Sequence, residues 1–248
     1  MQYKILNGAV SYDGDMVLEN VDIEINDREK IAIIGRNGSG KTTLLKLVAG
    51  LLTSNTGMIQ VCGQPVGPET KSLVSYLPDR TYLRSNQKIK DQMDFFQDFY
   101  ADFDRPRAED MLQKLGISPE QRFGTLSKGN REKVQLVLVM SRRAKLYLLD
   151  EPIGGVDPAA RDYILSTIIG SYNPEAAVII TTHLIYDIEP VLDEYIFVNY
   201  GGKIIGTDFE AIEKAENRDA FEKNCRQSLE KIKLQQKAVT DIVKNINK

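Results

Sequence analysis

The sequence has few residues suited to disulfide or zinc chemistry, and it has no apolar run of membrane length. Its 248 residues include two cysteines, Cys62 and Cys225, and a single histidine. The cysteines lie far apart and form no C-x-x-C motif, so we expect two idle thiols in a reducing cytosol rather than a zinc site or a disulfide framework. No apolar stretch approaches the ~20 residues that a membrane helix needs. The first residues, MQYKILNGAVSYDG, do not have the pattern of a signal peptide.

Strong charge of one sign is also lacking. The formal net charge is −3, so there is no overall basic field, and nucleic acid is not favoured as the main ligand. The composition, 42% hydrophobic and 27% charged, is that of an ordinary globular protein. At this length we expect one large domain, or one domain with an inserted subdomain.

The most specific motif is GRNGSGKTT, residues 35–43. An apolar run, residues 31–34, precedes it and a helical run follows, and the motif matches the phosphate loop G-x-x-x-x-G-K-[ST]. Glycines let successive backbone N–H groups face one anion, and the start of the helix adds its own unpaired N–H groups. Lys41 can reach the outer phosphates of a nucleoside triphosphate, and the Thr42 hydroxyl can ligate Mg²⁺. The predicted nucleotide-binding residues are Arg36, Asn37, Gly38, Ser39, Gly40, Lys41, Thr42 and Thr43.

The pattern along the chain predicts an α/β fold: a P-loop NTPase core with a parallel sheet, an N-terminal antiparallel β subdomain and an inserted helical subdomain. Residues 2–26 alternate between apolar and polar around a turn, which favours an antiparallel hairpin. The short apolar runs at 72–78, 146–151 and 176–183 are typical of buried parallel strands. The remaining expected segments are the helical insertion at about 79–145, a final hairpin at 194–206, and a charged amphipathic helical tail at 208–248 that follows the main domain, 1–207.

Acidic residues follow one of the apolar runs, in LYLLDE. Asp150 at the end of a buried strand is predicted to act on the Mg²⁺ side of the phosphate loop. The adjacent Glu151 is expected to point the other way along the pleat, where it can polarise a water. His183 ends another apolar run, IITTH, and this position at the end of a strand favours a functional role. Asp157, before Pro158, is expected at a helix start.

A second candidate anion site is LSKGN, which precedes a long helical stretch. Ser127 and the N–H groups of Gly129 and Asn130 are predicted to hold an anion at that helix start. By itself this pattern is weak, because Ser-x-Gly before a helix is common.

The ordered set GRNGSGKT, LSKGN, LYLLDE, GGVD and TTH, within residues 2–207, resembles the ATP-binding-cassette (ABC) ATPases. The resemblance implies that two such domains sandwich two ATP molecules, with Mg²⁺, as a homodimer or as a heterodimer with a related chain. Each site would pair the phosphate loop of one subunit with Ser127, Gly129, Asn130 and Asp157 of the other.

The resemblance also implies roles for single residues. Tyr12 would stack on adenine, Glu151 would be the general base, and Lys41 would contact the phosphates. His183 would contact the γ-phosphate and hold the base and the partner's Asp157 in place.

Two departures from the family pattern concern the site. Lys128 and Asn130 stand where the family signature LSGGQ has its second glycine and its glutamine. Asp79 stands where the family often has a glutamine that contacts Mg²⁺ and water. A carboxylate can ligate Mg²⁺ but cannot donate a hydrogen bond when ionised. Such acidic replacements resemble stand-alone ATPase subunits of small bacterial exporters.

The resemblance therefore implies the ATPase subunit of a transporter, most simply an exporter, that drives a separate transmembrane permease from the cytoplasmic face of the membrane. The aromatic cluster Phe95, Phe96, Phe99, Tyr100 and Phe103 would lie near the permease, although the helical spacing of Phe95, Phe99 and Phe103 more simply predicts core. Two alternatives remain open: a soluble ABC ATPase acting on nucleic acid or the ribosome, and a regulatory P-loop module with little hydrolysis.

Overall fold

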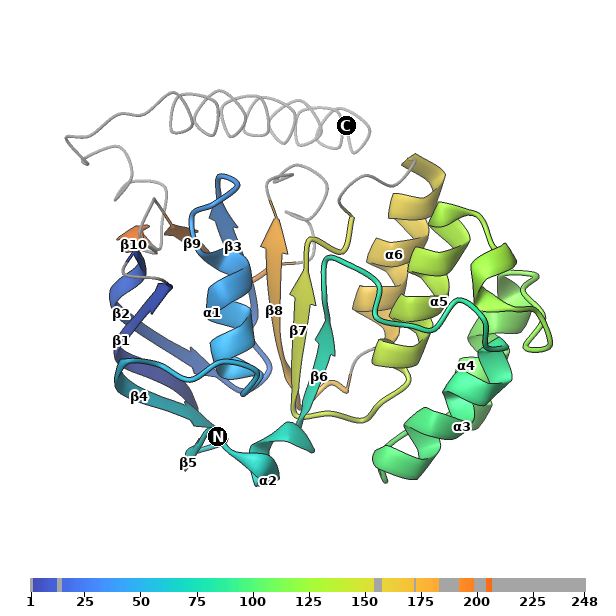
Figure 1. Cartoon of the computed structure of the whole chain (residues 1–248), viewed down its shortest axis with the longest axis horizontal. Helices are drawn as coiled ribbons and strands as arrows, with labels where there is room; N and C mark the ends of the chain where they lie inside the picture. Colours follow the sequence, from blue (N-terminus) through green and yellow to red (C-terminus); the bar gives the residue numbers. More distant parts are fainter. Residues whose placement is uncertain are drawn as a thin grey trace, which may run out of the picture.

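The structure, a computed structural model, describes residues 2–12, 15–153, 158–171, 173–182, 192–198 and 204–206. Figure 1 shows these residues as two sheets with helices around them. The predicted tail at 208–248 lies outside the described residues, as does the Gly201-Gly202 turn of the expected final hairpin.

A mostly parallel sheet forms the centre of the molecule. Its order is β10-β9-β3-β8-β7-β6, and each neighbouring pair except β10 with β9 is parallel. The strands are β3 Lys30–Gly35, β6 Val74–Leu77, β7 Leu146–Asp150, β8 Ala177–Thr182, β9 Glu194–Val198 and β10 Ile204–Gly206. Strands β7 and β8 are buried along their whole length, which explains their unbroken apolar sequences.

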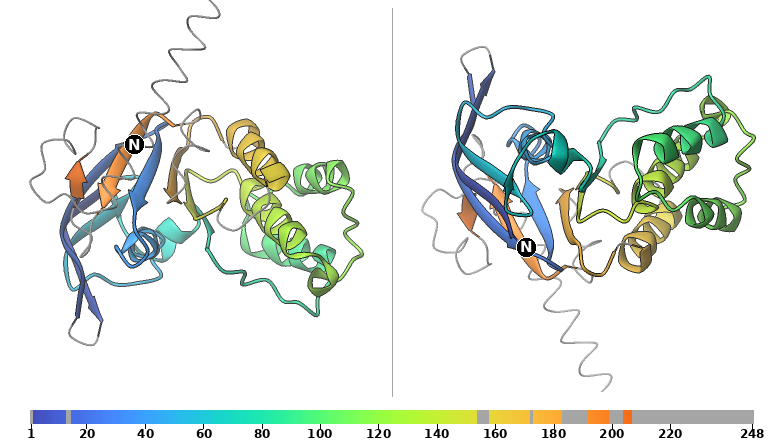
Figure 2. Two further views of the ribbon diagram at one scale, coloured as in Figure 1. Left: turned by 90° about the horizontal axis from the view of Figure 1, so that it is seen from above. Right: turned by 90° about the horizontal axis from the view of Figure 1, so that it is seen from below.

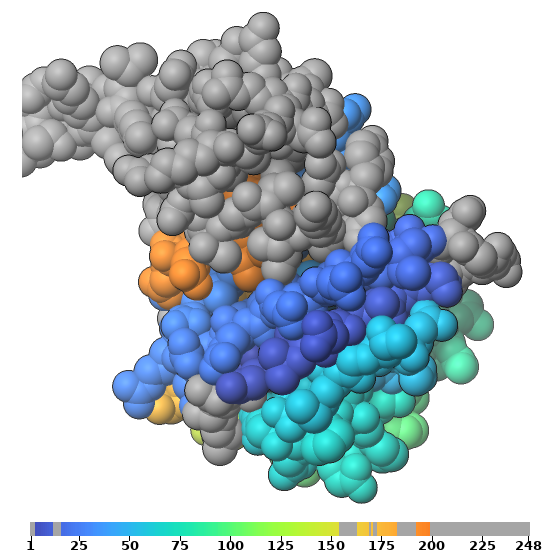
Figure 3. Space-filling model, turned by 90° about the vertical axis from the view of Figure 1, so that its left-hand side faces the viewer, coloured from blue at the N-terminus to red at the C-terminus, as the bar shows by residue number. Residues whose placement is uncertain are grey.

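A second, antiparallel sheet has the order β2-β1-β4-β5. Its strands are β1 Gln2–Tyr12, β2 Asp15–Asn26, β4 Thr56–Val61 and β5 Gln64–Pro65. The long strands of the hairpin run side by side across the face of the molecule seen in Figure 3. The alternation in the sequence places one side of this sheet against the core and the other in solvent.

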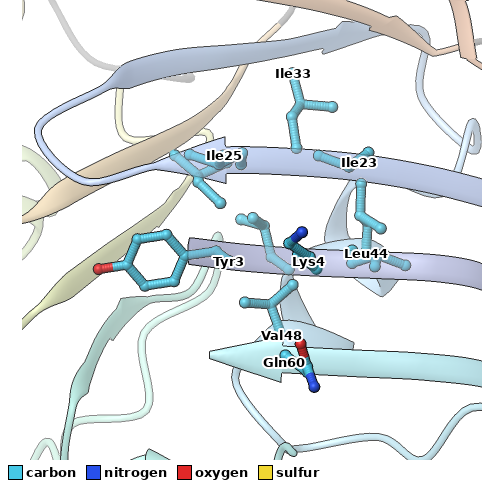
Figure 4. Close-up of a pocket in the computed structure, with 11 residues that line it drawn as sticks. Tyr3, Lys4, Ile23, Ile25, Ile33, Leu44, Val48 and Gln60 are labelled. Atoms are coloured by element: carbon cyan, nitrogen blue, oxygen red, sulfur yellow. The ribbon is translucent and has the colours of Figure 1, made fainter. Parts of the chain in front are cut away.

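Helix α1, Lys41–Val48, packs between the two sheets. Its buried leucines meet isoleucines and valines of both sheets in one apolar cluster. Figure 4 shows Leu44 and Val48 of α1 facing Ile23, Ile25 and Ile33 around a cavity of about 10 Å³. A cavity of this size is near the lower limit for one water, and its walls are almost entirely apolar. Helix α1 is therefore packed closely against apolar side chains of both sheets.

Helices α5, Lys128–Met140, and α6, Pro158–Ser171, cover the opposite face of the parallel sheet. Helices α3, Ile89–Phe99, and α4, Arg105–Lys114, pack outside α5 around a third apolar cluster (Figure 2). Two short helical turns complete the fold, α2 Pro68–Lys71 and η1 Phe123–Thr125. The helices α3, α4 and α5 all lie between β6 and β7 in the chain.

The aromatic stripe expected in the core is placed differently. Phe95 and Phe99 are 54% and 68% exposed, with ring centroids 4.4 Å apart, while Phe96 and Phe103 are buried. The prediction of core is wrong for Phe95 and Phe99, which lie on the outer face of α3, and right for Phe103, which lies beyond the end of that helix. The buried face of α3 is instead formed by Ile89, Gln92, Met93 and Phe96.

The predicted fold class is confirmed: a parallel sheet, an N-terminal antiparallel sheet and helices inserted before β7. Within the part of the chain that the structure describes, no helix combines the length and apolarity of a membrane span.

Candidate nucleotide-binding site

The loop between β3 and α1 lies at the carboxyl end of the parallel sheet (Figure 1). Its glycines are required by the backbone: Gly38 and Gly40 have φ angles of 83° and 97°. A Cβ atom on Gly35 would lie 2.5 Å from Ser39 Oγ and 2.6 Å from the carbonyl oxygen of Val198. The loop can therefore curl tightly onto the start of α1, whose first N–H groups have no partner within the helix. This is the geometry of an anion-binding loop.

Lys41 is the first residue of α1, and its side chain is only 6% exposed. Its Nζ donates hydrogen bonds to the carbonyl oxygens of Gly35 at 2.7 Å and Arg36 at 3.2 Å. The same Nζ lies 3.4 Å from Glu151 Oε1, which makes a largely buried ion pair. The ammonium group is thus held inside the mouth of the loop.

Asp150 ends β7 beside the loop and is 1% exposed. Its Oδ1 accepts hydrogen bonds from Thr181 Oγ1 at 2.6 Å and from Thr42 Oγ1 at 3.1 Å. Among the described residues, neither Asp150 Oδ2 nor Ser39 Oγ has a hydrogen-bond partner, although both atoms are buried. A buried carboxylate oxygen without a donor is costly unless a ligand or ion completes it. Carboxylate and hydroxyl oxygens beside a phosphate loop suit Mg²⁺, so the residues fit this ion.

Glu151 lies one residue beyond β7, with a left-handed φ of 49°. Its N–H donates to the Thr181 carbonyl and lies 3.1 Å from Thr181 Oγ1 as well. The sequence predicted that Glu151 and Asp150 point in opposite directions, as neighbours within a strand do. Glu151 lies beyond the end of the strand, so the turn sets the direction of its side chain. The side chain, 13% exposed, turns to Lys41.

Strand β6, next to β7, brings two further groups to this edge. Asp79 follows the strand by two residues and is exposed. Tyr76, within the strand, is half-buried, and its hydroxyl is buried without a hydrogen-bond partner in the described part of the chain. Burial raises the pKa of the Tyr76 phenol, and the nearby Asp150 carboxylate raises this pKa further. A phenol with its ordinary pKa is already protonated at neutral pH, so the Tyr76 hydroxyl is a donor there.

The LSKGN segment is separate from this site. Ser127 is the N-cap of α5, and its Oγ accepts a hydrogen bond from the Asn130 N–H at 3.3 Å. The Asn130 N–H expected for an anion is therefore already engaged in this conformation, and an anion would have to replace that bond. The Lys128 side chain is 69% exposed and lies 3.8 Å from Glu132. Since α5 packs on the face of the sheet opposite α1, this segment is not part of the loop's own site.

Three predicted residues cannot be placed. His183 and Asp157 lie outside the described residues, and of Tyr12 the structure describes only the backbone, at the end of β1. Two residues that contribute to the site were not predicted from the sequence. Thr181 stands in the run IITTH as a polar residue ending an apolar strand, which is a usable signal, and Tyr76 stands similarly in SLVSYLP.

The loop, the buried acid pair and the parallel sheet together define a P-loop nucleotide-binding protein. The profile of the ABC transporter family matches residues 18–154, more than half of the sequence. The chain therefore belongs to the ABC transporter family, and it has the fold of that family's ATP-binding subunits.

Similar proteins support this assignment. The chain is 31% identical over 180 residues to "ABC transporter ATP-binding protein YtrB" of Bacillus subtilis. The aligned region covers 71% of this chain and 62% of that protein. It is 28% identical to "Lipopolysaccharide export system ATP-binding protein LptB" of Haemophilus influenzae, covering 81% of this chain and 88% of the relative.

A solved "Structure of ATP binding subunit of ABC transporter" superposes with a TM-score of 0.74 at 25% identity, over 84% of this chain and 90% of that one.

Proposed function

We propose that this chain binds and hydrolyses ATP with Mg²⁺ and thereby drives a separate membrane permease, most simply in export. The observation that carries the proposal is the convergence of Lys41, Thr42, Asp150 and Glu151, from two distant parts of the chain, at one edge of the sheet. Two relatives are named for export, one of lipopolysaccharide and one of Nod factor. Working from the cytoplasmic face of the membrane is part of the same proposal.

The site residues take the following roles in this proposal. The N–H groups of residues 36–43 hold the phosphates. The Lys41 ammonium group, which now donates to the carbonyl oxygens of Gly35 and Arg36, donates to phosphate oxygens instead. Thr42, Asp150 and, from β6, Asp79 would hold Mg²⁺, which would supply positive charge against the charge that develops on the phosphates. Glu151, released from Lys41, takes the proton of the attacking water. Tyr12 stacks on adenine, and His183 contacts the γ-phosphate.

A dimer is proposed because one chain offers only half of such a site. Ser127, Gly129 and Asn130 start a helix on the far face of the sheet, so they are available to the nucleotide of a second subunit. Asp157, from the GGVD motif, would join these residues at the nucleotide of the second subunit. The second subunit is either an identical chain or a related one.

A groove between the core and the inserted helices is the proposed permease contact. It has a volume of about 460 Å³ and extends from the end of α1 and β6 to α3. Aromatic side chains of the insertion form one wall, namely Tyr82, Phe95, Phe96 and Tyr100. The exposed pair Phe95 and Phe99 extends this wall outward. Exposed aromatic side chains beside a groove are typical of protein contacts.

The test of hydrolysis is Glu151→Gln. We expect this variant to bind ATP with Mg²⁺, to turn over about 10²–10⁴-fold more slowly because the base is lost, and to accumulate an ATP-bound dimer. ATPase assays and light scattering with ATP measure both effects. Glu175→Gln is the matched control, because Glu175 is an exposed acid paired with Arg28. Wild-type turnover in Glu151→Gln would remove Glu151 from its role as base.

The test of the transport role uses the same variant. Tagged Glu151→Gln, purified with ATP and Mg²⁺ from detergent-solubilised cells, should carry a membrane protein with several spans, identified by mass spectrometry. Recovery of ribosomal proteins or nucleic acid alone would favour the soluble, non-transport alternative.

A further inference from the structure

Two of the buried polar atoms that lack a hydrogen bond in the described residues lie on neighbouring strands at the same edge of the parallel sheet. One is Asp150 Oδ2, and the other is the hydroxyl of Tyr76. Both belong to the described residues, and each is a group whose burial without a hydrogen bond is unfavourable. Two such atoms in one place indicate a shared polar partner.

The sheet register places Tyr76 and Asp150 on the same side. Tyr76 of β6 pairs with Leu148 of β7 in parallel register, and Asp150 is two residues further along β7. Since side chains alternate along a strand, Leu148 and Asp150 project to the same face as Tyr76, the face covered by α1. The two polar groups therefore lie on neighbouring strands, on one face of the sheet and near the same strand ends.

Asp150 uses only one of its oxygens in protein contacts. Thr181 and Thr42 both donate to Oδ1, which fixes that side of the carboxylate. The phenol of Tyr76, on the neighbouring strand and the same face, is a donor without a hydrogen bond of normal length in the described residues. Mg²⁺ usually keeps several waters when it binds to protein carboxylates and phosphates, and such waters need acceptors and donors in the site.

We infer that Tyr76 is a positioning residue of the Mg²⁺ site, whose hydroxyl and Asp150 Oδ2 together hold one water of the bound metal. This inference rests on the proposed function, because it needs a metal–nucleotide complex in the loop. The ring of Tyr76 also lines the groove proposed for the permease, so the same side chain lies between that groove and the metal carboxylate.

The experiment compares Tyr76→Phe with Tyr3→Phe, each of which removes one phenol oxygen from the same apolar cluster. Tyr3 is the matched control because its hydroxyl donates to the Lys145 carbonyl at 2.6 Å, away from Asp150. The probe is Mn²⁺ with ADP, followed by electron paramagnetic resonance. ADP affinity in the presence of EDTA reports binding without metal.

We expect Tyr76→Phe to weaken Mn²⁺ binding by about 3- to 10-fold, the value of one ordinary hydrogen bond, with metal-free ADP affinity unchanged. Its melting temperature without metal should be unchanged or higher, because a buried unpartnered hydroxyl is removed. Tyr3→Phe should melt lower and keep wild-type Mn²⁺ affinity. If Tyr76 had only a structural role, Tyr76→Phe would melt at a lower temperature and would keep the wild-type Mn²⁺ affinity.

The outcomes separate the two proposals. If wild-type protein binds Mn²⁺–ADP and Tyr76→Phe binds the metal equally well, the role of Tyr76 is refuted while the proposed function stands. If wild-type protein binds no nucleotide in the presence of Mg²⁺ or Mn²⁺, the proposed function is refuted, and the role of Tyr76 is refuted with it.

Discussion

At the scale of single residues, Asp150 and Glu151 at the end of β7 are positioned by contacts with the neighbouring strand β8 and with helix α1. Asp150 is held by hydroxyls of Thr42 and Thr181, so its carboxylate has one engaged oxygen and one open oxygen. Glu151 is turned by its positive φ toward Lys41, 110 positions away in sequence (151 − 41). The two adjacent carboxylates thereby have different partners: Asp150 accepts from two threonine hydroxyls, and Glu151 pairs with the lysine.

Thr181 carries a residue-scale prediction. Thr181→Val keeps the shape of the side chain but removes the donor to Asp150, so we expect about 1–3 kcal/mol lower stability in urea unfolding. We also expect weaker nucleotide binding with Mg²⁺. Thr181→Ser keeps the hydroxyl and loses a methyl group, so its Mg²⁺-dependent affinity should stay near the wild-type value. Equal affinities of Thr181→Val and wild type would show that Asp150 is positioned without this bond.

At the scale of elements, one buried arginine joins the inserted helices to the parallel sheet. The Arg142 side chain is 2% exposed, and its guanidinium pairs with both oxygens of Asp102 at 3.0 and 3.1 Å. It also donates to the carbonyl oxygens of Ser72 and Val74, before and at the start of β6. The ring of Tyr100 lies 3.7 Å from its central carbon. The connection after α3 and the start of β6 are therefore fixed to each other by one side chain.

The neighbouring arginines give a matched comparison at this scale. Arg142→Met should lower the free energy of unfolding by about 3 kcal/mol, because Asp102 and two carbonyls lose their donor. Arg143→Met should change it by less than about 0.5 kcal/mol, since the Arg143 side chain is 71% exposed where it pairs with Asp104. Urea denaturation measures both, and equal losses would mean that the buried guanidinium does not join the two parts.

At the scale of the whole molecule, the nucleotide loop and the groove lie at opposite ends of α1. The helix starts at the phosphate loop with Lys41, and Lys46 and Ala49, in and just after its last turn, line the groove. Helix α1 is packed on both sides by the two sheets, so it is a rigid element between the two places. In the proposed function, this helix would carry a change at the nucleotide to a permease seated in the groove.

The exposed aromatic pair is predicted to serve the partner and not the fold. The double variant Phe95→Ser with Phe99→Ser should leave ATP affinity and the ATPase rate of the isolated subunit within about two-fold, because both rings are largely exposed. Recovery of the permease in the pull-down should fall at least about 10-fold. Met58→Ser is the control, because Met58 is another exposed apolar residue, 45% exposed, and lies on the antiparallel sheet. Unchanged recovery in the double variant would place the permease contact elsewhere.

The sequence alone determined the parts of this protein that depend on local chemistry. The glycines of GRNGSGKTT prescribe a tight loop between a strand and a helix, and unbroken apolar runs such as LYLLD prescribe buried strands. The alternation before residue 26 likewise predicted the antiparallel hairpin. These features depend on neighbours within a few residues, so they can be read without the fold.

The tertiary structure alone decided what distant segments do to each other. The hydrogen bond from Thr181 to Asp150 and the closeness of Tyr76 to the same carboxylate depend on the order β8-β7-β6 in the sheet, which no local pattern encodes. The exposure of Phe95 and Phe99 depends on which face of α3 packs into the cluster of inserted helices. Helical spacing predicts that a face exists, but packing decides which face is buried.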